Sequence, residues 1–363
     1  MSRLFGCEYS ARDLNERTGR LDQICGIAPF EFSDGRAKGV RAFDVRNGDG
    51  FRFTSVADRA LDVCALEFRG IPLVWHGPGG LAAPTYYQPR GEDFPRNFFG
   101  GLFTTCGLNN FGPGGTDAFG SFGTHGRVNH LPAENLATEM HWTNERCTLQ
   151  ISGTVVEAQM FGESLRLERR LCIDVGTNRL NLHDAVTNDG GTRRPHMLLY
   201  HCNMGFPLLD SSARLEVSHR SMRPRDEQAA RGLGAWNRGG EPDPAFAEQV
   251  FIHEPAACAD GRARAVMLNR SLDDGRGIAL VVEYDPRQLP ALFTWRMLGA
   301  KTYVMGIEPA NCTTIEGRTE AGNRGTLPFL EAGERRTYDL SFEVLAGRDQ
   351  IERVLAQLGE LET

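Results

Sequence analysis

The chain has 363 residues, of which 40% are apolar and 24% are charged, and its formal net charge is −7. This composition is typical of a globular protein with a substantial core, and the lack of any Lys/Arg run argues against nucleic acid as the main partner. The N-terminal residues contain no apolar run of signal-peptide length, and no window reaches the roughly 18 apolar residues of a membrane-spanning helix. We therefore expect a soluble, cytoplasmic protein without a membrane partner.

The cysteines agree with this expectation. There are nine of them, they are scattered, and no Cys-x-x-Cys pair occurs. We therefore predict neither a disulfide framework nor a thiolate zinc site, and we expect reduced thiols.

Strand signals dominate the chain. Residues 51–56 and 147–156 alternate apolar and polar side chains, which is typical of a strand with one buried face. Residues 164–175 repeat the pattern and are predicted to pair with 147–156 in an antiparallel sheet. Further strands are predicted at residues 61–68, 179–186, 197–201, 213–218, 278–284 and 337–344.

Gly and Pro interrupt these segments frequently, and many strands joined by such turns predict an all-β protein, a large antiparallel β-sandwich. Residues 77–123 and 224–247 look irregular. The one convincing helix is C-terminal, where apolar residues at i, i+3, i+4 and i+7 predict a helix over about 349–361. No break in composition divides the chain, so we expect a single domain over 1–363 with its core at about 50–345.

Three segments place an ionisable side chain among apolar or glycine neighbours. In the first, His125 and Arg127 would share a face if the segment were extended, and both could donate hydrogen bonds to hydroxyl oxygens. The alternative is a turn with a structural His and a solvated Arg.

In the second segment, His201 follows an apolar strand and precedes Gly205-Phe206-Pro207, which places it at a strand end where active-site residues often lie. Histidine is the simplest proton donor near neutral pH. The alternative is a core histidine bonded to the backbone.

In the third, Glu308 follows an apolar run and precedes Pro309, which is expected to end sheet pairing. A carboxylate in an apolar setting is costly unless it is paired or functional, and burial raises its pKa. The alternative is a salt bridge with Arg296 or Lys301.

Other motifs are weaker or absent. Arg59 could form an ion pair with Asp62 that fixes a turn. No dinucleotide fingerprint, phosphate-binding loop or His-Glu-x-x-His motif occurs, and the nine histidines do not cluster at ligand spacing. No metal site and no cofactor are predicted.

The order of these motifs resembles the galactose mutarotase-like (aldose 1-epimerase) superfamily. The resemblance rests on His125-Gly126, then His201 after an apolar strand, then Glu308-Pro309, and it spans roughly residues 50–345. Residues 100–108 and 295–299 look like an uncharacterised bacterial branch of that group. The residues beside His201 depart from the usual pattern, and Asp285 is only a guess for the acidic residue that grips sugar hydroxyls.

The resemblance implies an aldose 1-epimerase that interconverts the α and β anomers of a small-molecule sugar on a β-sandwich with few short helices. Glu308 would be the catalytic base and His201 the catalytic acid. The resemblance leaves the sugar and the oligomeric state open, and a homodimer is compatible with it. The residues assigned to substrate binding are His125, Arg127, Arg59, Trp295 and Asn203.

Two alternatives use the same kind of fold. A glycoside hydrolase or lyase would need a second carboxylate facing Glu308. Glu92, Asp93 and Glu316 are the candidates for it. A non-catalytic carbohydrate-binding protein would bind sugars without accelerating anomer exchange. Aromatic side chains that could form a platform for a sugar face are Tyr86, Tyr87, Phe98, Phe99 and Trp295.

Overall fold

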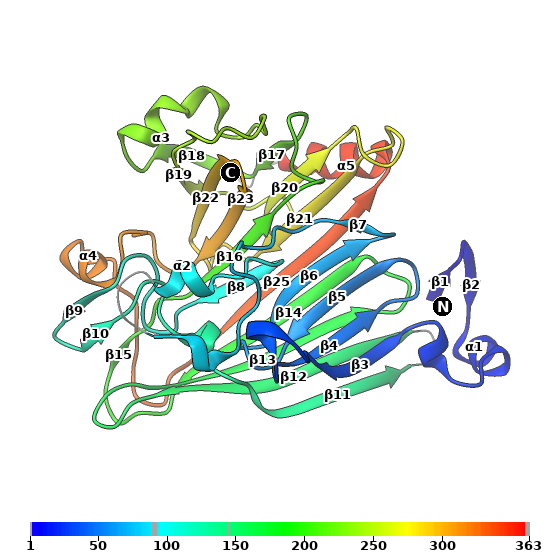
Figure 1. Cartoon of the computed structure of the whole chain (residues 1–363), viewed down its shortest axis with the longest axis horizontal. Helices are drawn as coiled ribbons and strands as arrows, with labels where there is room; N and C mark the ends of the chain where they lie inside the picture. Colours follow the sequence, from blue (N-terminus) through cyan, green and yellow to red (C-terminus); the bar gives the residue numbers. More distant parts are fainter. Residues whose placement is uncertain (1, 89–92, 144–145, 360–363) are drawn as a thin grey trace.

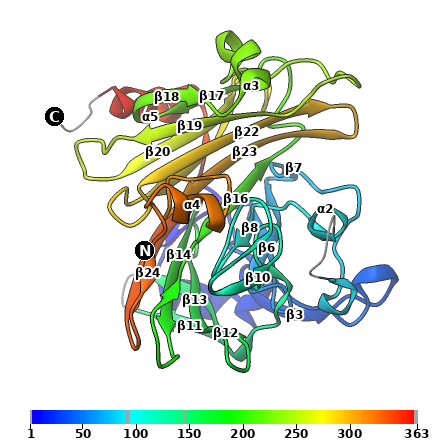
Figure 2. The same ribbon diagram turned by 90° about the vertical axis from the view of Figure 1, so that its left-hand side faces the viewer.

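The computed structural model describes residues 2–88, 93–143 and 146–359. Two large antiparallel sheets pack face to face, as Figures 1 and 2 show from two sides. The protein is therefore a large antiparallel β-sandwich, which confirms the predicted fold class.

The larger sheet has eleven strands. In spatial order they are β18 (His219–Pro224), β19 (Gln249–Pro255), β22 (Ala291–Gly299), β23 (Thr302–Ala310), β16 (Leu199–Met204), β8 (Phe103–Cys106), β6 (Asp62–Phe68), β5 (Phe51–Val56), β4 (Arg41–Arg46) and β3 (Gly26–Glu31), with β7 (Ile71–Pro72) paired to β6.

The second sheet has eight strands. In spatial order they are β11 (Glu134–Trp142), β12 (Cys147–Ala158), β13 (Ser164–Asp174), β14 (Arg179–Asn188), β25 (Arg335–Ala346), β21 (Ile278–Tyr284), β20 (Ala263–Asn269) and β17 (Arg214–Val217).

The remaining elements are short. Two-stranded pairs are β1 (Ser2–Leu4) with β2 (Cys7–Tyr9), β9 (Gly115–Asp117) with β10 (Gly120–Phe122), and β15 (Arg194–Pro195) with β24 (Phe329–Leu330). The α-helices of the described residues are α1 (Ala11–Arg17), α2 (Asp93–Asn97), α3 (Glu227–Arg231), α4 (Arg318–Asn323) and α5 (Arg348–Leu358).

Strand alternation explains why the sheets meet where they do. Along β12, Cys147, Leu149, Ile151 and Val155 are buried against the other sheet, while the residues between them are more exposed. This is the pattern of a strand with one wet face. The central strands β16 and β23 differ, because every residue of β16 and seven consecutive residues of β23 are buried. Their second face must therefore be covered by something other than the eight-stranded sheet.

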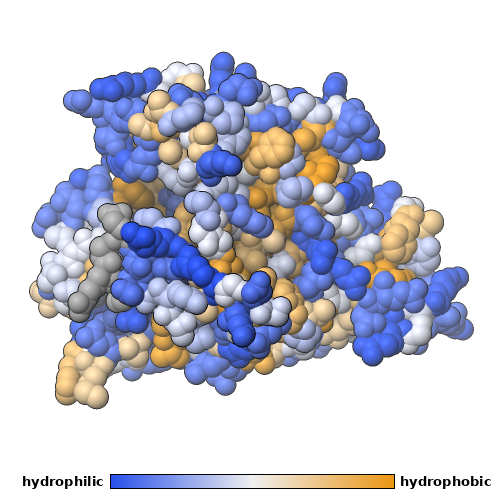
Figure 3. Space-filling view, in the orientation of Figure 1, coloured by the Kyte–Doolittle hydropathy of each residue, from blue (hydrophilic) through white to orange (hydrophobic). Residues whose placement is uncertain are grey.

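The cover comes from the loop-rich segments of the chain. A second apolar cluster joins Leu199 of β16 and Val304 of β23 to Trp75, Phe94 and Phe98, which precede β8. In Figure 1, α2, α4 and the β9–β10 hairpin gather on one side of the sandwich. Polar residues dominate the face seen in Figure 3, with apolar residues visible between them near the middle and at the lower left and right edges. The central strands β16 and β23 of the large sheet thus have the inter-sheet core on one face and this second cluster on the other.

Most predicted strands are confirmed, and the differences have simple reasons. The range of β5 is the predicted one, and β12 and β13 are antiparallel neighbours. The large sheet begins before residue 50, because β3 and β4 belong to it. The segment 77–123 contains β8, which pairs with the distant strands β16 and β6, and 224–247 contains α3, which the Asp226 side chain caps. Helix α5 ends at Leu358, and residues 360–361 of the predicted helix lie outside the described residues.

The nine cysteines are free thiols. No helix in the described part of the chain is long and apolar enough to cross a membrane.

Candidate active site

His201 and Glu308 lie side by side on neighbouring strands of the large sheet. The register of β16 and β23 pairs Leu199 with Ala310 and Cys202 with Ile307, so His201 lies opposite Glu308. Their side chains contact each other, with 3.3 Å between Nε2 and Oε1, and both residues are less than 10% exposed. Because Cys202 and Ile307 belong to the inter-sheet core, His201 and Glu308 point to the opposite face, under the second apolar cluster.

This arrangement corrects two local expectations. His201 lies inside β16 and not at its end, and Pro309 lies inside β23, where it faces Leu292. The alternative salt bridge of Glu308 is not formed either, because Arg296 donates to the carbonyl of Arg238 and to Gln249.

A glycine makes room for the Glu308 carboxylate. Gly306 precedes it by two residues and therefore lies on the same face of β23. A Cβ at Gly306 would lie 2.7 Å from Oε1 of Glu308 and 3.0 Å from Cβ of Trp295. The carboxylate and the indole thus occupy the space that a side chain at position 306 would fill.

Aromatic rings surround the pair. The His201 ring lies 5.4 Å from Trp295 and 4.9 Å from Phe98 between centroids, both edge to face. Phe94 packs on His125 at 4.6 Å. Such walls exclude water, and an exposed ring edge or face can pack on the apolar face of a sugar.

His125 completes the group of three sequence-predicted residues. Its ring lies 6.0 Å from that of His201, so one small ring could contact both. It sits on a tight turn, with φ of 56° at His125 and 68° at Gly126. A Cβ at Gly126 would meet the Gly107 carbonyl oxygen at 2.2 Å, which requires glycine there.

The turn overturns the expectation that His125 and Arg127 share a face. The segment is not extended, and Arg127 is exposed whereas His125 is partly buried against Phe94. We therefore place Arg127 at the outside of the turn and not beside the His201–Glu308 pair.

Burial sets the proton affinities of the three residues. It raises the pKa of Glu308 to about 8, with the Glu248 carboxylate adding to the rise and Arg225 opposing it. It lowers the pKa of His201 to about 3, and that of His125 to about 4. In both histidines the imidazolium loses hydration that the protein does not replace. The His201–Glu308 pair therefore holds one proton over a broad pH range around neutrality.

Glu248 was missed by the sequence analysis. It lies just before β19, accepts a hydrogen bond from Nε1 of Trp295 at 3.1 Å and pairs with Arg225 at 3.0 Å. It is one of the groups that raise the pKa of Glu308. It stands between Ala247 and Gln249 at the end of the segment that was expected to be irregular, and no motif in the sequence singles it out.

Asn203 and Arg59 are bonded to the backbone. The Asn203 amide, buried on β16, donates to the carbonyls of His201 at 2.6 Å and Gly101 at 3.2 Å. Arg59 is fully buried and donates to three main-chain carbonyls, namely those of Ala82 at 2.9 Å, Asn97 at 3.1 Å and Asn129. Arg59 therefore holds loops together, and we do not retain it as a substrate-binding residue.

Two further guesses from the sequence are wrong. Asp62 pairs with Arg169 at 2.6 Å and not with Arg59. Asp285 follows β21 in the other sheet and pairs with Arg287 at 2.7 Å. Packing of the two sheets brings Asp62 to Arg169, whereas Asp285 pairs with Arg287, two residues further along the chain.

The other aromatic residues proposed as a platform for a sugar face, and the carboxylates proposed to face Glu308, contact other residues. Tyr86 lies under Arg36, Tyr87 stacks on His130, and Phe99 lies under Arg59. Of the candidate second carboxylates, Glu316 pairs with Arg324 at 3.3 Å, Asp93 accepts from Asn97 at 3.1 Å, and Glu92 lies outside the described residues.

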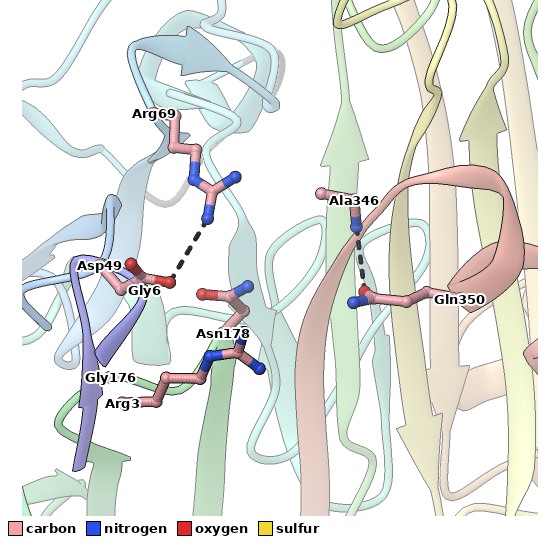
Figure 4. A pocket seen from close by; sticks show the side chains of 8 residues that line it. All are labelled: Arg3, Gly6, Asp49, Arg69, Gly176, Asn178, Ala346 and Gln350. Carbon is pink, nitrogen blue, oxygen red and sulfur yellow. Dashed lines mark hydrogen bonds and ion pairs between the residues drawn. The ribbon is translucent and has the colours of Figure 1, made fainter. Parts of the chain in front are cut away.

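No group of three or more His, Cys, Asp or Glu side chains in the described ranges is arranged to hold a metal ion. A separate polar pocket of about 310 Å³ lies beside the N-terminal β1–β2 pair (Figure 4). Arg69 and Asp49 form an ion pair of 3.4 Å in it. It shares no residue with the His201–Glu308 site.

Comparison with known structures supports the fold. A "putative aldose 1-epimerase" from Klebsiella pneumoniae superposes with a TM-score of 0.87 at 22% identity, covering 98% of this chain and 91% of that one. A galactose mutarotase-like protein from Clostridium acetobutylicum gives 0.61 at 13% identity, covering 89% and 99%. Galactose 1-epimerase from Lactobacillus acidophilus gives 0.56 at 13%, covering 89% and 100%.

At these identities the comparisons concern the fold alone. No curated protein matches the sequence. A family model described as a domain of unknown function, DUF4432, matches residues 37–344. The chain therefore belongs to the DUF4432 family, on a galactose mutarotase-like fold.

Proposed function

We propose that the protein is an aldose 1-epimerase, which interconverts the α and β anomers of a sugar by opening and closing its ring. The observation that carries the proposal is the 3.3 Å contact between His201 and Glu308 in a buried, aromatic-walled place beside His125. The two oxygens that exchange protons in this reaction are bonded to the same anomeric carbon. Two groups that serve them must therefore lie next to each other.

In the proposed mechanism, the Glu308 carboxylate takes the proton of the anomeric hydroxyl while His201 gives its Nε2 proton to the ring oxygen. The bond between the anomeric carbon and the ring oxygen breaks, and an open aldehyde forms. After rotation about the adjacent carbon–carbon bond, the ring oxygen attacks the other aldehyde face. The proton returns to His201, and Glu308 gives its proton to the new anomeric hydroxyl, so the pair regains its starting state.

The number of protons held by the His201–Glu308 pair suits this cycle. A carboxylate beside an imidazolium holds the same single proton as a neutral carboxyl beside a neutral imidazole. Since the two side chains are in contact, one transfer between them converts the resting pair into the reactive pair. His125, whose pKa is lowered to about 4 by burial, is neutral at pH 7 and can bond to a hydroxyl without adding charge.

The test compares Glu308→Gln and His201→Asn with the unchanged protein in anomer exchange, followed by polarimetry or NMR. A panel of aldohexoses, hexose 6-phosphates and hexuronic acids supplies the substrates. Each variant should lose on the order of 10²- to 10⁴-fold, because each removes one proton transfer. Glu254→Gln, an exposed Glu on β19, is the matched control and should keep full activity. Wild-type rates in both site variants would reject the proposal.

A glycoside hydrolase is the second candidate, because Glu248 is a carboxylate close enough to raise the pKa of Glu308. A hydrolase needs a proton donor and a facing carboxylate. Glu248 is paired with Arg225 at 3.0 Å, while His201 lies in direct contact with Glu308, so the epimerase is the better fit. Release of reducing sugar from oligosaccharides, lost in Glu248→Gln, would favour the hydrolase. Sugar binding in calorimetry without any turnover would favour a binding protein.

A further inference from the structure

Glu157 is a buried carboxyl group that the proposed mechanism does not use. It lies on β12 and is 1% exposed, on the face that this strand turns to the inter-sheet core together with Val155. One of its oxygens, Oε1, has no hydrogen-bond partner among the described residues. A buried polar atom without a partner is costly, so Glu157 calls for an explanation in terms of what its other oxygen does.

Oε2 of Glu157 holds a single peptide group of the loop-rich segment. It accepts a hydrogen bond from the main-chain N–H of Leu108 at 3.0 Å. The carbonyl of the same peptide group, that of Gly107, accepts from the main-chain N–H of Arg127 at 3.0 Å. A peptide group is planar, so a bond that holds its N–H also fixes the direction of its carbonyl. One peptide group therefore connects Glu157 to the turn that carries His125.

The same segment holds both the main chain and the ring of His125. The His125 carbonyl accepts from the Gly107 N–H at 3.1 Å, and the His125 N–H donates to the Gly112 carbonyl at 2.8 Å. The Gly112 N–H in turn donates to Nδ1 of the ring at 3.4 Å. Because a main-chain N–H only donates, Nδ1 is an acceptor and the neutral ring carries its hydrogen on Nε2. The Nε2–H is thus the donor that His125 can offer to a hydroxyl oxygen.

We propose that Glu157 is a positioning residue, whose hydrogen bond to the Leu108 N–H fixes the turn from which His125 binds the sugar. This inference rests on the proposed function and adds to it a residue that acts through the turn. The role requires the contact and not a charge, because the group that Glu157 holds is a neutral N–H. Burial raises the pKa of Glu157 to about 8, which agrees with a carboxyl group that is mostly uncharged at neutral pH.

Two variants separate the contact from the charge. Glu157→Gln removes the ionisable group and keeps an oxygen within reach of the Leu108 N–H, so it should behave as wild type. Glu157→Asp keeps the carboxyl group but withdraws it by one methylene, so the bond should be lost. Glu163→Asp is the matched control, because Glu163 makes a bond of 3.1 Å to the side chain of Asn109, the residue after Leu108.

The first measurement is the tautomer of His125, read from ring ¹⁵N shifts of protein labelled with ¹⁵N-histidine and assigned with His125→Gly. Wild type, Glu157→Gln and Glu163→Asp should carry the hydrogen on Nε2. Glu157→Asp should show a mixture of the two tautomers, because the loosened turn no longer holds the Gly112 N–H against Nδ1. A wild-type ring with its hydrogen on Nδ1, or an unchanged ring in folded Glu157→Asp, would overturn the proposal.

The second measurement is anomer exchange. Glu157→Asp should raise KM about 3- to 10-fold with kcat within about twofold, because a hydrogen bond to the sugar is weakened while both proton transfers are kept. In a His125→Gly background, which suits the positive φ of that position, the same change should have no further effect on KM, since the two residues act through one contact. Equal effects in both backgrounds would overturn the proposal. An equally raised KM in Glu157→Gln would do the same, and this variant decides the question if Glu157→Asp does not fold.

The two proposals fail separately. If wild-type protein does not accelerate anomer exchange in any sugar of the panel, the proposed function fails. The tautomer measurement still decides whether Glu157 positions the His125 turn.

Discussion

Two groups of buried ionisable side chains lie on opposite faces of the large sheet. On the inner face, Arg169 reaches from β13 to Asp62 and Asp184, each at 2.6 Å, and all three are fully buried. On the outer face, His201 and Glu308 share one contact of 3.3 Å. Both groups place ionisable side chains on strands of the sandwich, but the two groups differ in how completely those side chains are hydrogen-bonded.

The inner group is almost completely hydrogen-bonded. The Arg169 guanidinium also donates to the Ala60 carbonyl and to Thr105, and Tyr200 donates to Asp184 at 2.7 Å. Among the described residues the outer pair keeps a buried nitrogen without a hydrogen-bond partner, whereas burial raises the pKa of a carboxyl group in both groups, Asp62 in the inner one and Glu308 in the outer one. A buried cluster that satisfies itself joins two sheets, whereas one that does not retains capacity to bind and to exchange protons. The predictions below test this difference.

The largest expected effect on stability comes from Arg169→Met. It leaves Asp62 and Asp184 buried without a counter-charge, which typically costs about 3–5 kcal/mol in the free energy of unfolding. Arg166→Met on the same strand removes a partly exposed pair with Asp189 and should cost about 0–1 kcal/mol. Urea denaturation measures both. Similar costs for the two variants would mean that the inner cluster contributes little to stability.

Glu308→Gln should increase the free energy of unfolding, by an amount that depends on pH. The pKa of Glu308 is raised in the folded state to about 8, so its contribution to stability is fully present below the unfolded pKa of about 4.5 and is lost as pH rises through 8. As pH rises, the free energy of unfolding of the variant should therefore increase relative to that of wild type by about 1 kcal/mol per pH unit, or about 3 kcal/mol between pH 5 and 8. Urea midpoints across this range measure it, with Glu254→Gln as the control that stays level. A constant difference would mean that Glu308 ionises freely.

The two groups could be predicted from the sequence only where the pattern that marks a residue lies in its own segment of the chain. Alternation is local, and it predicts β5 and β12 well. Glu308 and His201 could be singled out by their apolar neighbours and by motif order, but their contact depends on pairing of distant strands. Arg59 was misread because the carbonyls that hold it belong to loops far along the chain.

Two features of the outer group could not be predicted from strand patterns in the sequence. The turn at His125 requires a positive φ, which reverses the direction of Arg127. Glu248 enters the site only because β19 lies beside β22 and brings it to Trp295. The glycine that the turn requires, Gly126, is visible in the sequence but does not give the direction of Arg127, and sheet order leaves no mark beside Glu248.

Gly306→Ala should damage the outer pair while sparing the fold. The new Cβ would collide with Oε1 of Glu308 at 2.7 Å, and a flexible carboxylate can move aside. A displaced base should reduce kcat by about 10- to 100-fold, because small misplacements of reacting groups are costly. Gly191→Ala, which opens onto free space, is the matched control and should be neutral. Unchanged kcat in Gly306→Ala would show that the observed position of the carboxylate is not the one used in the reaction.

The smallest expected effect is the pH dependence of the unchanged protein. Anomer exchange requires that the His201–Glu308 pair hold one proton. With the pKa of Glu308 raised by burial to about 8, the pair loses that proton above pH 8, and kcat/KM should fall about tenfold per pH unit there. With the pKa of His201 lowered by burial to about 3, no second proton binds until strongly acidic pH, so the rate should stay level from pH 5 to 7. The control is the residual rate of Glu308→Gln. It should not fall at alkaline pH, which separates titration of the His201–Glu308 pair from titration of the sugar. A wild-type rate that rises through pH 8 would mean that the pair acts only after losing its proton. A mechanism with a single base would then replace the proposed roles of the two residues.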